Sequence, residues 1–144
     1  MSESFLTDLR TLIDVDSSVG TRARYSSDAG LTRIPPLAVA FPCTPEQAAA
    51  AFHLARAHGV PLTARGGGTS CASNAIGPGL VLDFSRYMNR VISIDPEART
   101  ATVEPGCVGS TLQAASAKYG LRFGPDPSSQ NRATIAGMVA NNAC

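Results

Sequence analysis

Three consecutive glycines at positions 66–68 constrain this chain more than any other feature of its sequence. They follow an apolar segment, residues 60–64, and precede Thr69 and Ser70. Because glycine has no Cβ and reaches positive φ, such a run lets several main-chain N–H groups converge on one anion, and the two hydroxyls add donors. The segment therefore predicts a phosphate-binding loop at the carboxyl end of a strand, the alternative being a flexible surface turn.

Other phosphate-binding motifs fit this segment poorly. Cys71 stands where a dinucleotide-binding fingerprint of the Rossmann type has its third glycine, and no Gly-Lys-Ser/Thr sequence occurs anywhere in the chain. Conventional NAD-binding and ATP-binding folds are therefore disfavoured.

The residues before the glycines predict a strand, helix, strand unit. Residues 37–41 form a short apolar run between prolines, which is typical of a buried strand. Thr44 is a helix N-cap, Pro45 occupies the first helical position, and an alanine-rich run then continues to His58 and ends at Gly59. With residues 60–64 as the second strand, the glycine loop lies where ligands bind in α/β sheets.

Weaker patterns give the remaining elements. An amphipathic helix is predicted over residues 3–13, followed by an irregular lead-in over 16–36. Ser110 and Gln113 read as a second capping box that opens a helix through Tyr119. The other predicted elements are strands at 80–84, 91–94 and 100–103, the last two forming a hairpin, a short strand at 121–123, a loop at 124–133, and a helix at 135–143 capped by Thr134.

Length, charge and cysteine spacing exclude several classes of protein. With 144 residues there is room for one core, and 12 basic against 11 acidic residues leave no basic cluster for nucleic acid or an anionic membrane. No apolar stretch suits a membrane span, and the polar N-terminus does not resemble a signal peptide, so a cytoplasmic protein is predicted. Cys43, Cys71, Cys107 and Cys144 include no CxxC pair, which predicts no local metal site and reduced, mostly buried thiols.

The segment from Gly124 to Gly137 is a second candidate ligand loop. Its length is unusual for a plain connection in a compact domain, although a simple helix-entry loop is the alternative. Gly137 near a helix N-terminus lets a ligand approach the main chain, where the helix dipole favours negative charge. Two anion-binding loops in one small domain predict a ligand with two phosphates.

From Tyr25 to Cys144 the chain resembles the FAD-binding (PCMH-type) domain of the vanillyl-alcohol oxidase / p-cresol methylhydroxylase superfamily. The resemblance is carried by RGGGTS and SSQNRATIAGMVANN, in order, with LVLDFSRYMNR and TVEPG between them. It is strongest to the glycolate oxidase / D-lactate dehydrogenase-like branch. The implied fold is α+β, a small βαβ subdomain plus the start of a second mixed-sheet subdomain. Residues 1–24 would be an N-terminal helix and lead-in, and 25–144 a domain incomplete at its C-terminus.

The resemblance also implies where FAD would bind. The glycine loop would hold the pyrophosphate, with Arg65 orienting the loop, and the second loop would line the ribityl and isoalloxazine region. Thr69 stands where covalently flavinylated members have His, which implies noncovalent FAD. Ala136 replaces a family glycine and requires a negative φ there. The implied cofactor-binding residues are Arg65, Gly66, Gly67, Gly68, Thr69, Ser70, Pro125, Asp126, Ala133, Thr134, Ile135, Gly137 and Asn141.

The implied activity is oxidation of a 2-hydroxy acid of the glycolate, D-lactate or D-2-hydroxyglutarate type by hydride transfer to flavin. In this family the catalytic base and the substrate-binding groups follow this segment, so no catalytic residue is assigned and the fragment alone is expected to be inactive. Long bacterial members append an iron–sulfur domain beyond such a segment. The electron acceptor is left open.

Two other functions remain open from the residues alone: a non-redox nucleotide- or anion-binding module using the same loop, and an interaction domain whose glycines form only a turn. His53 and His58 lie about 140° apart around the predicted helix and cannot share a metal ion. Asp83 and Glu104 end strands, but no nucleophile or base is paired with either.

Overall fold

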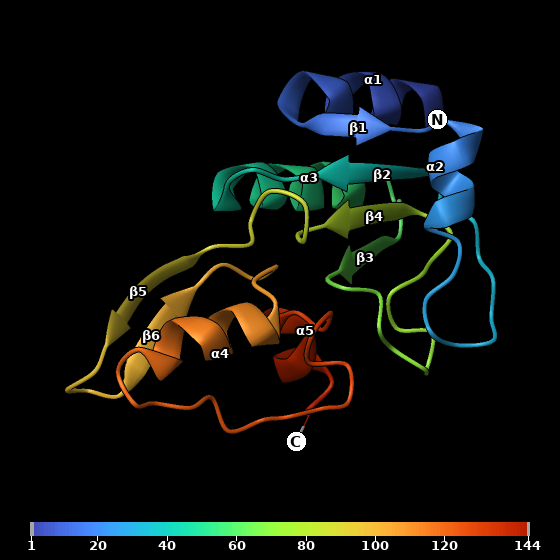
Figure 1. Ribbon diagram of the computed structural model, residues 1–144. Helices are drawn as coiled ribbons and strands as arrows, with labels where there is room; N and C mark the ends of the chain where they lie inside the picture. The colour runs from blue at the N-terminus through green and yellow to red at the C-terminus, as the bar shows by residue number, and fades with distance from the viewer. Residues whose placement is uncertain (1, 144) are drawn as a thin grey trace.

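The computed structural model describes residues 2–143, so Cys144 lies outside the described part of the chain. The elements form two groups, which Figure 1 shows at the top and at the bottom of the molecule. In chain order they are α1 (Ser2–Leu12), β1 (Asp14–Asp16), α2 (Val19–Arg24), β2 (Ala38–Phe41), α3 (Pro45–Ala57), β3 (Leu62–Arg65), β4 (Leu80–Asp83), β5 (Val91–Asp95), β6 (Thr100–Val103), α4 (Gly109–Ala117) and α5 (Ile135–Ala140).

The first group is a four-stranded mixed sheet in the order β1-β2-β4-β3. β4 pairs in parallel with both β2 and β3, whereas β1 pairs antiparallel with β2 at the edge. The predicted strand, helix, strand unit is therefore present, with β4 inserted between its two strands. The glycine loop leaves the sheet at the carboxyl end of β3, as the sequence predicts.

Alternation along the strands gives the sheet two apolar faces. Ala38, Ala40, Leu80 and Leu82 pack with residues of α1 and α3 in the main core. The intervening residues, Val39, Phe41 and Val81, form a smaller cluster with Tyr25 on the opposite face. Both central strands are buried along their whole length, which explains their continuous apolar sequence.

Helix α3 begins as its sequence predicts. Thr44 is the N-cap, and its hydroxyl accepts a hydrogen bond from the main-chain N–H of Gln47. The side-chain oxygen of Gln47 in turn accepts from the main-chain N–H of Cys43 at 2.8 Å, and Pro45 occupies the first turn. Gly59 has a φ of 63°, which permits the chain to leave the helix and return toward β3.

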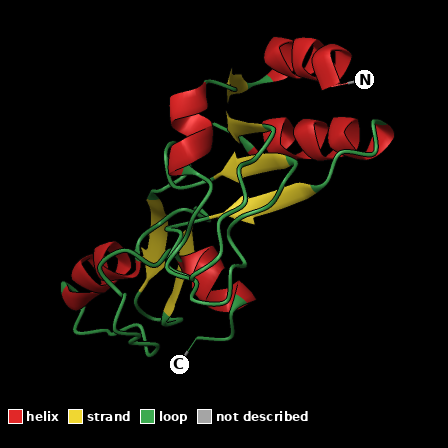
Figure 2. Cartoon of the chain, turned by 90° about the vertical axis from the view of Figure 1, so that its right-hand side faces the viewer, coloured by secondary structure: helices red, strands yellow, loops and turns green. Residues whose placement is uncertain are grey.

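The second group contains the β5–β6 hairpin, α4 and α5, and Figure 2 shows it below the sheet of the first group. The hairpin has a register irregularity between Val91 and Ser93. At its turn the Asp95 carboxylate accepts hydrogen bonds from the main-chain N–H groups of Glu97 and Ala98. The predicted α+β class, with one mixed sheet and the start of a second sheet, is confirmed.

Several local predictions are wrong. Residues 16–36 are not wholly irregular, because Ser18 caps the helix α2. Helix α4 begins at Gly109 with no side-chain cap, because its N-cap residue is Val108, which has no polar side chain. The Gln113 side chain accepts from the main-chain N–H of Phe123, and residues 121–123 form no strand. Helix α5 ends at Ala140. Cys107 is buried, but Cys43 and Cys71 are exposed.

Asp16 joins the end of β1 to the start of α2. Its carboxylate accepts hydrogen bonds from the Thr21 hydroxyl and the Ser18 main-chain N–H at 2.6 and 2.8 Å. These bonds, that from Thr21 above all, lower the pKa of Asp16 from 3.8 to about 2. Because the folded-state pKa is the lower one, the ionised group stabilises the fold above about pH 4, and this contribution is lost as the pH falls toward 2.

We therefore expect Asp16→Asn to lower the stability of the protein at neutral pH. Near pH 2, where Asp16 itself becomes protonated, the variant and the wild type should have nearly the same stability. Urea unfolding midpoints of the two proteins, measured from neutral pH downward, test this. A gap between the two midpoints that stays constant with pH would contradict the assignment.

Candidate functional site

The glycine loop packs directly against the second candidate loop. A side chain at Gly66 would overlap the hydroxyl of Thr134, and a side chain at Gly67 would overlap the main-chain carbonyl oxygen of Arg132. These two glycines are therefore required by the close approach of two segments more than 60 positions apart in the sequence. The predicted pairing of the two loops at one place is present in the structure.

Gly68 has a different reason to be glycine. Its φ of 64° lies in the left-handed region, and the position where its side chain would stand is occupied by the Arg65 guanidinium. That guanidinium donates to the carbonyl oxygens of Ser27 and Ala75, both at 3.0 Å, and lies 5.0 Å from the centre of the Tyr25 ring. Arg65 thus ties the glycine loop to two other segments of the chain.

The main-chain N–H groups of residues 66–70 are available to a ligand. No hydrogen bond from any of them to an acceptor is found within residues 2–143. The loop also ends in Ser70, whose hydroxyl accepts from the main-chain N–H groups of Ala72 and Asn74. A row of uncommitted amides on a glycine-rich loop is the arrangement that binds phosphate oxygens.

The start of α5 does not provide such amides. Ile135 donates to the carbonyl oxygen of Cys107, Ala136 donates to that of Pro105, and Gly137 donates to the hydroxyl of Thr134. These N–H groups are therefore already paired within the protein, and anion binding at this helix N-terminus stays a prediction. Gly137 instead lines the cavity, and a side chain there would make a tight contact with the Thr134 hydroxyl, at 3.1 Å. Ala136 lies within the helix and is not among the residues with positive φ, as its alanine requires.

The two loops enclose a cavity of about 500 Å³, within the range of small-molecule sites. Its walls come from the end of β3, the loop after it, the segment 127–134 and α5. The residues that line it are Ala64, Gly66, Gly67, Gly68, Thr69, Ser70, Cys71, Ala72, Asn74, Ala75, Pro127, Ser129, Ala133, Thr134, Gly137, Met138, Ala140, Asn141 and Ala143.

Nine of the thirteen residues proposed from the resemblance line this cavity: Gly66, Gly67, Gly68, Thr69, Ser70, Ala133, Thr134, Gly137 and Asn141. The other four do not line it. Arg65 lies behind Gly68, and Asp126 forms an ion pair with Arg122 at 2.7 Å. Pro125 lies in the second loop and Ile135 begins α5, but neither residue lines the cavity.

Sequence reasoning missed the part of the wall between the glycines and β4. Asn74 lines the cavity, and its side-chain amide donates to Oδ1 of Asn141 at 2.9 Å, which joins the loop to the end of α5. Cys71 was not missed: its position two residues after Thr69 indicates a thiol near the ligand, with a buried structural cysteine as the favoured alternative, and in the structure it lines the cavity and is exposed. Residues 71–79 have no periodicity or motif of their own, so only their proximity to the glycines in the sequence pointed to them.

Asp83 and Glu104 have structural partners. The buried Asp83 carboxylate accepts from the Tyr25 hydroxyl at 2.5 Å and from Ser85, and burial together with this bond raises the pKa of Tyr25. Glu104 binds the Arg90 guanidinium through both carboxylate oxygens, and these hydrogen bonds lower the pKa of Glu104.

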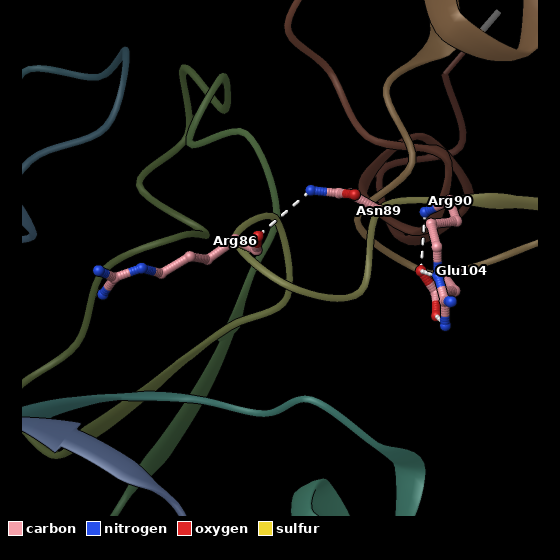
Figure 3. Close-up of polar contacts among 4 residues, drawn as sticks. All are labelled: Arg86, Asn89, Arg90 and Glu104. Atoms are coloured by element: carbon pink, nitrogen blue, oxygen red, sulfur yellow. Dashed lines mark hydrogen bonds and ion pairs between the residues drawn. The ribbon is translucent and has the colours of Figure 1, made fainter.

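The segment between β4 and β5 is stabilised by its own contacts. Figure 3 shows the Arg90–Glu104 pair, and beside it the Asn89 side-chain amide, which donates to the carbonyl oxygen of Arg86. The Arg86 side chain extends away from these groups and stacks on the Phe41 ring, 4.4 Å from its centre. None of these groups lines the cavity. No cluster of possible metal ligands is found among the described residues, and no described helix is long and apolar enough to span a membrane.

A mixed sheet with a glycine-rich loop at a strand's carboxyl end, facing a second loop across a cavity, defines a domain that binds a phosphate-bearing cofactor. The sequence profile of the FAD binding domain family matches residues 36–144. The chain belongs to this family.

Curated relatives include D-2-hydroxyglutarate dehydrogenase from Escherichia coli, 35% identical over 133 residues. This match covers 90% of the chain and 13% of the relative. Glycolate oxidase subunit GlcD from Bacillus subtilis is 36% identical over 131 residues, covering 89% of the chain and 27% of the relative. The chain thus spans much less than half of the length of these relatives.

Solved structures share the fold. An alkyldihydroxyacetonephosphate synthase has a TM-score of 0.85 at 23% identity, with 96% of this chain and 29% of that chain covered. p-Cresol methylhydroxylase with substrate bound has a TM-score of 0.81 at 18% identity, with 98% and 29% covered. Together with the family match, these confirm the predicted PCMH-type FAD-binding fold.

The residues of the cavity fit FAD. Uncommitted amides at 66–70 suit the diphosphate, and the absence of side chains at Gly66 and Gly67 lets the two loops close to each other beside it. Beyond the loop, the wall of small and apolar residues, such as Ala133, Gly137 and Met138, suits uncharged parts of a dinucleotide.

Breaking the link between Asn74 and Asn141 should weaken FAD binding modestly. The bond is exposed, so we expect Asn74→Ala to raise the Kd for FAD about threefold to tenfold, the net value of one such hydrogen bond. Fluorescence titration of the purified apoprotein measures it. Asn89→Ala is the control, because Asn89 makes a similar side-chain amide bond away from the cavity and its variant should leave the Kd unchanged.

Proposed function

We propose that this chain is the FAD-binding part of a flavin-dependent oxidoreductase that oxidises a 2-hydroxy acid of the D-2-hydroxyglutarate, D-lactate or glycolate type. The observation that supports the substrate class is the 35–36% identity over about nine-tenths of the chain to enzymes named for D-2-hydroxyglutarate and glycolate. The family match favours this function over a non-redox phosphate-binding module.

The chain's own residues have a positioning role in this proposal. The amides of residues 66–70 hold the diphosphate, and Thr134 fixes the glycine loop against the second loop. Of the thirteen cofactor-binding residues named above, twelve remain the proposed cofactor contacts, and Arg65 acts through the loop. When bound, FAD supplies the hydride acceptor for the hydrogen on the substrate's α-carbon.

We also propose that the FAD is bound noncovalently. Thr69 occupies the position where covalent attachment would require His, and the two histidines of the chain lie on α3 and at its end, away from the cavity. The domain boundary at residues 24/25 and the cytoplasmic location stay predictions; the α1 and β1 segments, although before that boundary, pack on the sheet.

The test uses the purified full-length enzyme of which this chain is the proposed FAD-binding part. We expect a visible flavin spectrum, flavin released into the supernatant on acid precipitation, and anaerobic bleaching by one of three added substrates: D-2-hydroxyglutarate, D-lactate or glycolate. A colourless protein that does not take up FAD would overturn the flavin proposal. A flavoprotein that none of the three acids reduces, but another reductant does, would overturn only the substrate class.

A further inference from the structure

The guanidinium of Arg65 is held by uncharged partners. Its Nη1 donates to the carbonyl oxygens of Ser27 and Ala75, both at 3.0 Å, and its plane lies over the Tyr25 ring at 5.0 Å. No ion pair of Arg65 is found within residues 2–143. The arginine therefore keeps its positive charge without a carboxylate in direct contact.

The carboxylates near it are engaged elsewhere. Asp28 accepts hydrogen bonds from the main-chain N–H groups of Gly30 and Ala75. Asp83 accepts from the Tyr25 hydroxyl and from Ser85. Both groups hold the framework around Arg65, but neither lies within ion-pair distance of its guanidinium.

The cavity itself has no charged wall. Every described residue that lines it is apolar, a glycine or an uncharged polar residue. Gly68 lines the cavity on one side, and the Arg65 guanidinium occupies the place of its missing side chain on the other. One glycine thus separates a fixed positive charge from the row of uncommitted amides.

We propose that Arg65 supplies the positive charge that attracts the FAD diphosphate, acting through Gly68 without touching the cofactor. The inference rests on the proposed flavin function. A charge fixed close behind a loop, partly shielded from water, attracts an anion more strongly than an exposed one, and added salt screens that attraction. Two carbonyls and a ring hold the guanidinium behind Gly68, where it does not line the cavity.

The experiment is a titration of the purified full-length apoprotein with FAD at several salt concentrations. We expect Arg65→Met, which keeps the apolar stem, to raise the Kd about tenfold or more at low salt. The same variant should also flatten the dependence of the Kd on salt. Arg22→Met is the matched control, because Arg22 also donates to a main-chain carbonyl, that of Pro36, and its loss changes the net charge equally.

Arg65→Lys separates charge from packing, and also serves if the methionine variant fails to fold. Lysine keeps the charge but cannot bond both carbonyls and stack on the ring in the same way. We expect it to retain the wild-type salt dependence with a Kd within about threefold of the wild type. Equal losses of affinity in both variants, with the salt dependence unchanged, would overturn the inference.

Two further outcomes are distinguishable. If Arg132→Met rather than Arg65→Met removes the salt dependence, the charge comes from the exposed arginine of the second loop and the inference is overturned. If the wild-type protein binds no FAD at any salt concentration, the proposed function fails as well.

Discussion

Replacing Gly67 with alanine is expected to weaken FAD binding about a hundredfold or more. The new methyl group would overlap the carbonyl oxygen of Arg132, a main-chain atom that cannot rotate away as a side chain can. The two loops must then move apart, which displaces the amides of residues 66–70 from the diphosphate. We expect the Kd for FAD to rise about a hundredfold or more, equivalent to ~2.7 kcal/mol of lost binding energy.

The measurement is the Kd for FAD of the purified apoprotein, together with its melting temperature. Gly124→Ala is the matched control: it makes the same chemical change in the second loop, at a glycine with no atom within 4 Å of the new methyl group and no positive φ. We expect this control to bind FAD as the wild type does. A folded Gly67→Ala protein with wild-type affinity would show that the contact between the loops does not position the amides.

The site shows what a sequence can and cannot predict. The three glycines at 66–68 indicate a main chain that side chains would not fit, because only glycine suits such a loop. The N-cap Thr44 likewise indicates where α3 begins. These signals are local, so they can be read from neighbouring residues. They place the glycine loop at the end of β3 without any knowledge of the fold.

Contacts between distant segments could not be predicted in this way. Gly66 is glycine because of Thr134, and Asn74 lines the cavity because it meets Asn141, but neither partner is visible from the sequence around it. The main-chain N–H groups at the start of α5 donate to the carbonyl oxygens of Cys107 and Pro105. These bonds also join segments far apart in the sequence, so they could not be predicted from neighbouring residues. The resemblance supplied the pairing of the two loops, which the residues alone left open.

The amphipathic spacing predicts helix α1, which the structure confirms over Ser2–Leu12, but strand β1 and helix α2 are short and have too little sequence signal to be predicted. In the structure α1 covers one face of the sheet, with Phe5 and Leu9 fully buried against Ala51 and Ala55 of α3. Strand β1 extends the sheet at its edge. The part of the chain that precedes the family match therefore belongs to the same hydrophobic core.

We accordingly expect Phe5→Ala to destabilise the protein strongly. The ring has no exposed surface and packs in the main core, near the His58 ring at a centroid distance of 5.6 Å. Removing such a ring costs about 3 to 5 kcal/mol, from lost burial and from the cavity left behind. This is a large part of the free energy of unfolding of a typical domain, roughly 5 to 15 kcal/mol. Urea unfolding, followed by circular dichroism, measures the change.

Leu12→Ala is the control, since Leu12 lies on the same helix but is 40% exposed and outside the core cluster. We expect it to shift the unfolding midpoint much less than Phe5→Ala. The comparison separates two arrangements of the first helix. If α1 is part of the core, Phe5→Ala lowers the urea concentration at which the protein unfolds, and bound FAD is released in the same unfolding transition. If both variants unfold at the wild-type midpoint, α1 contributes nothing to the core, and the sheet that carries the glycine loop is stable without it.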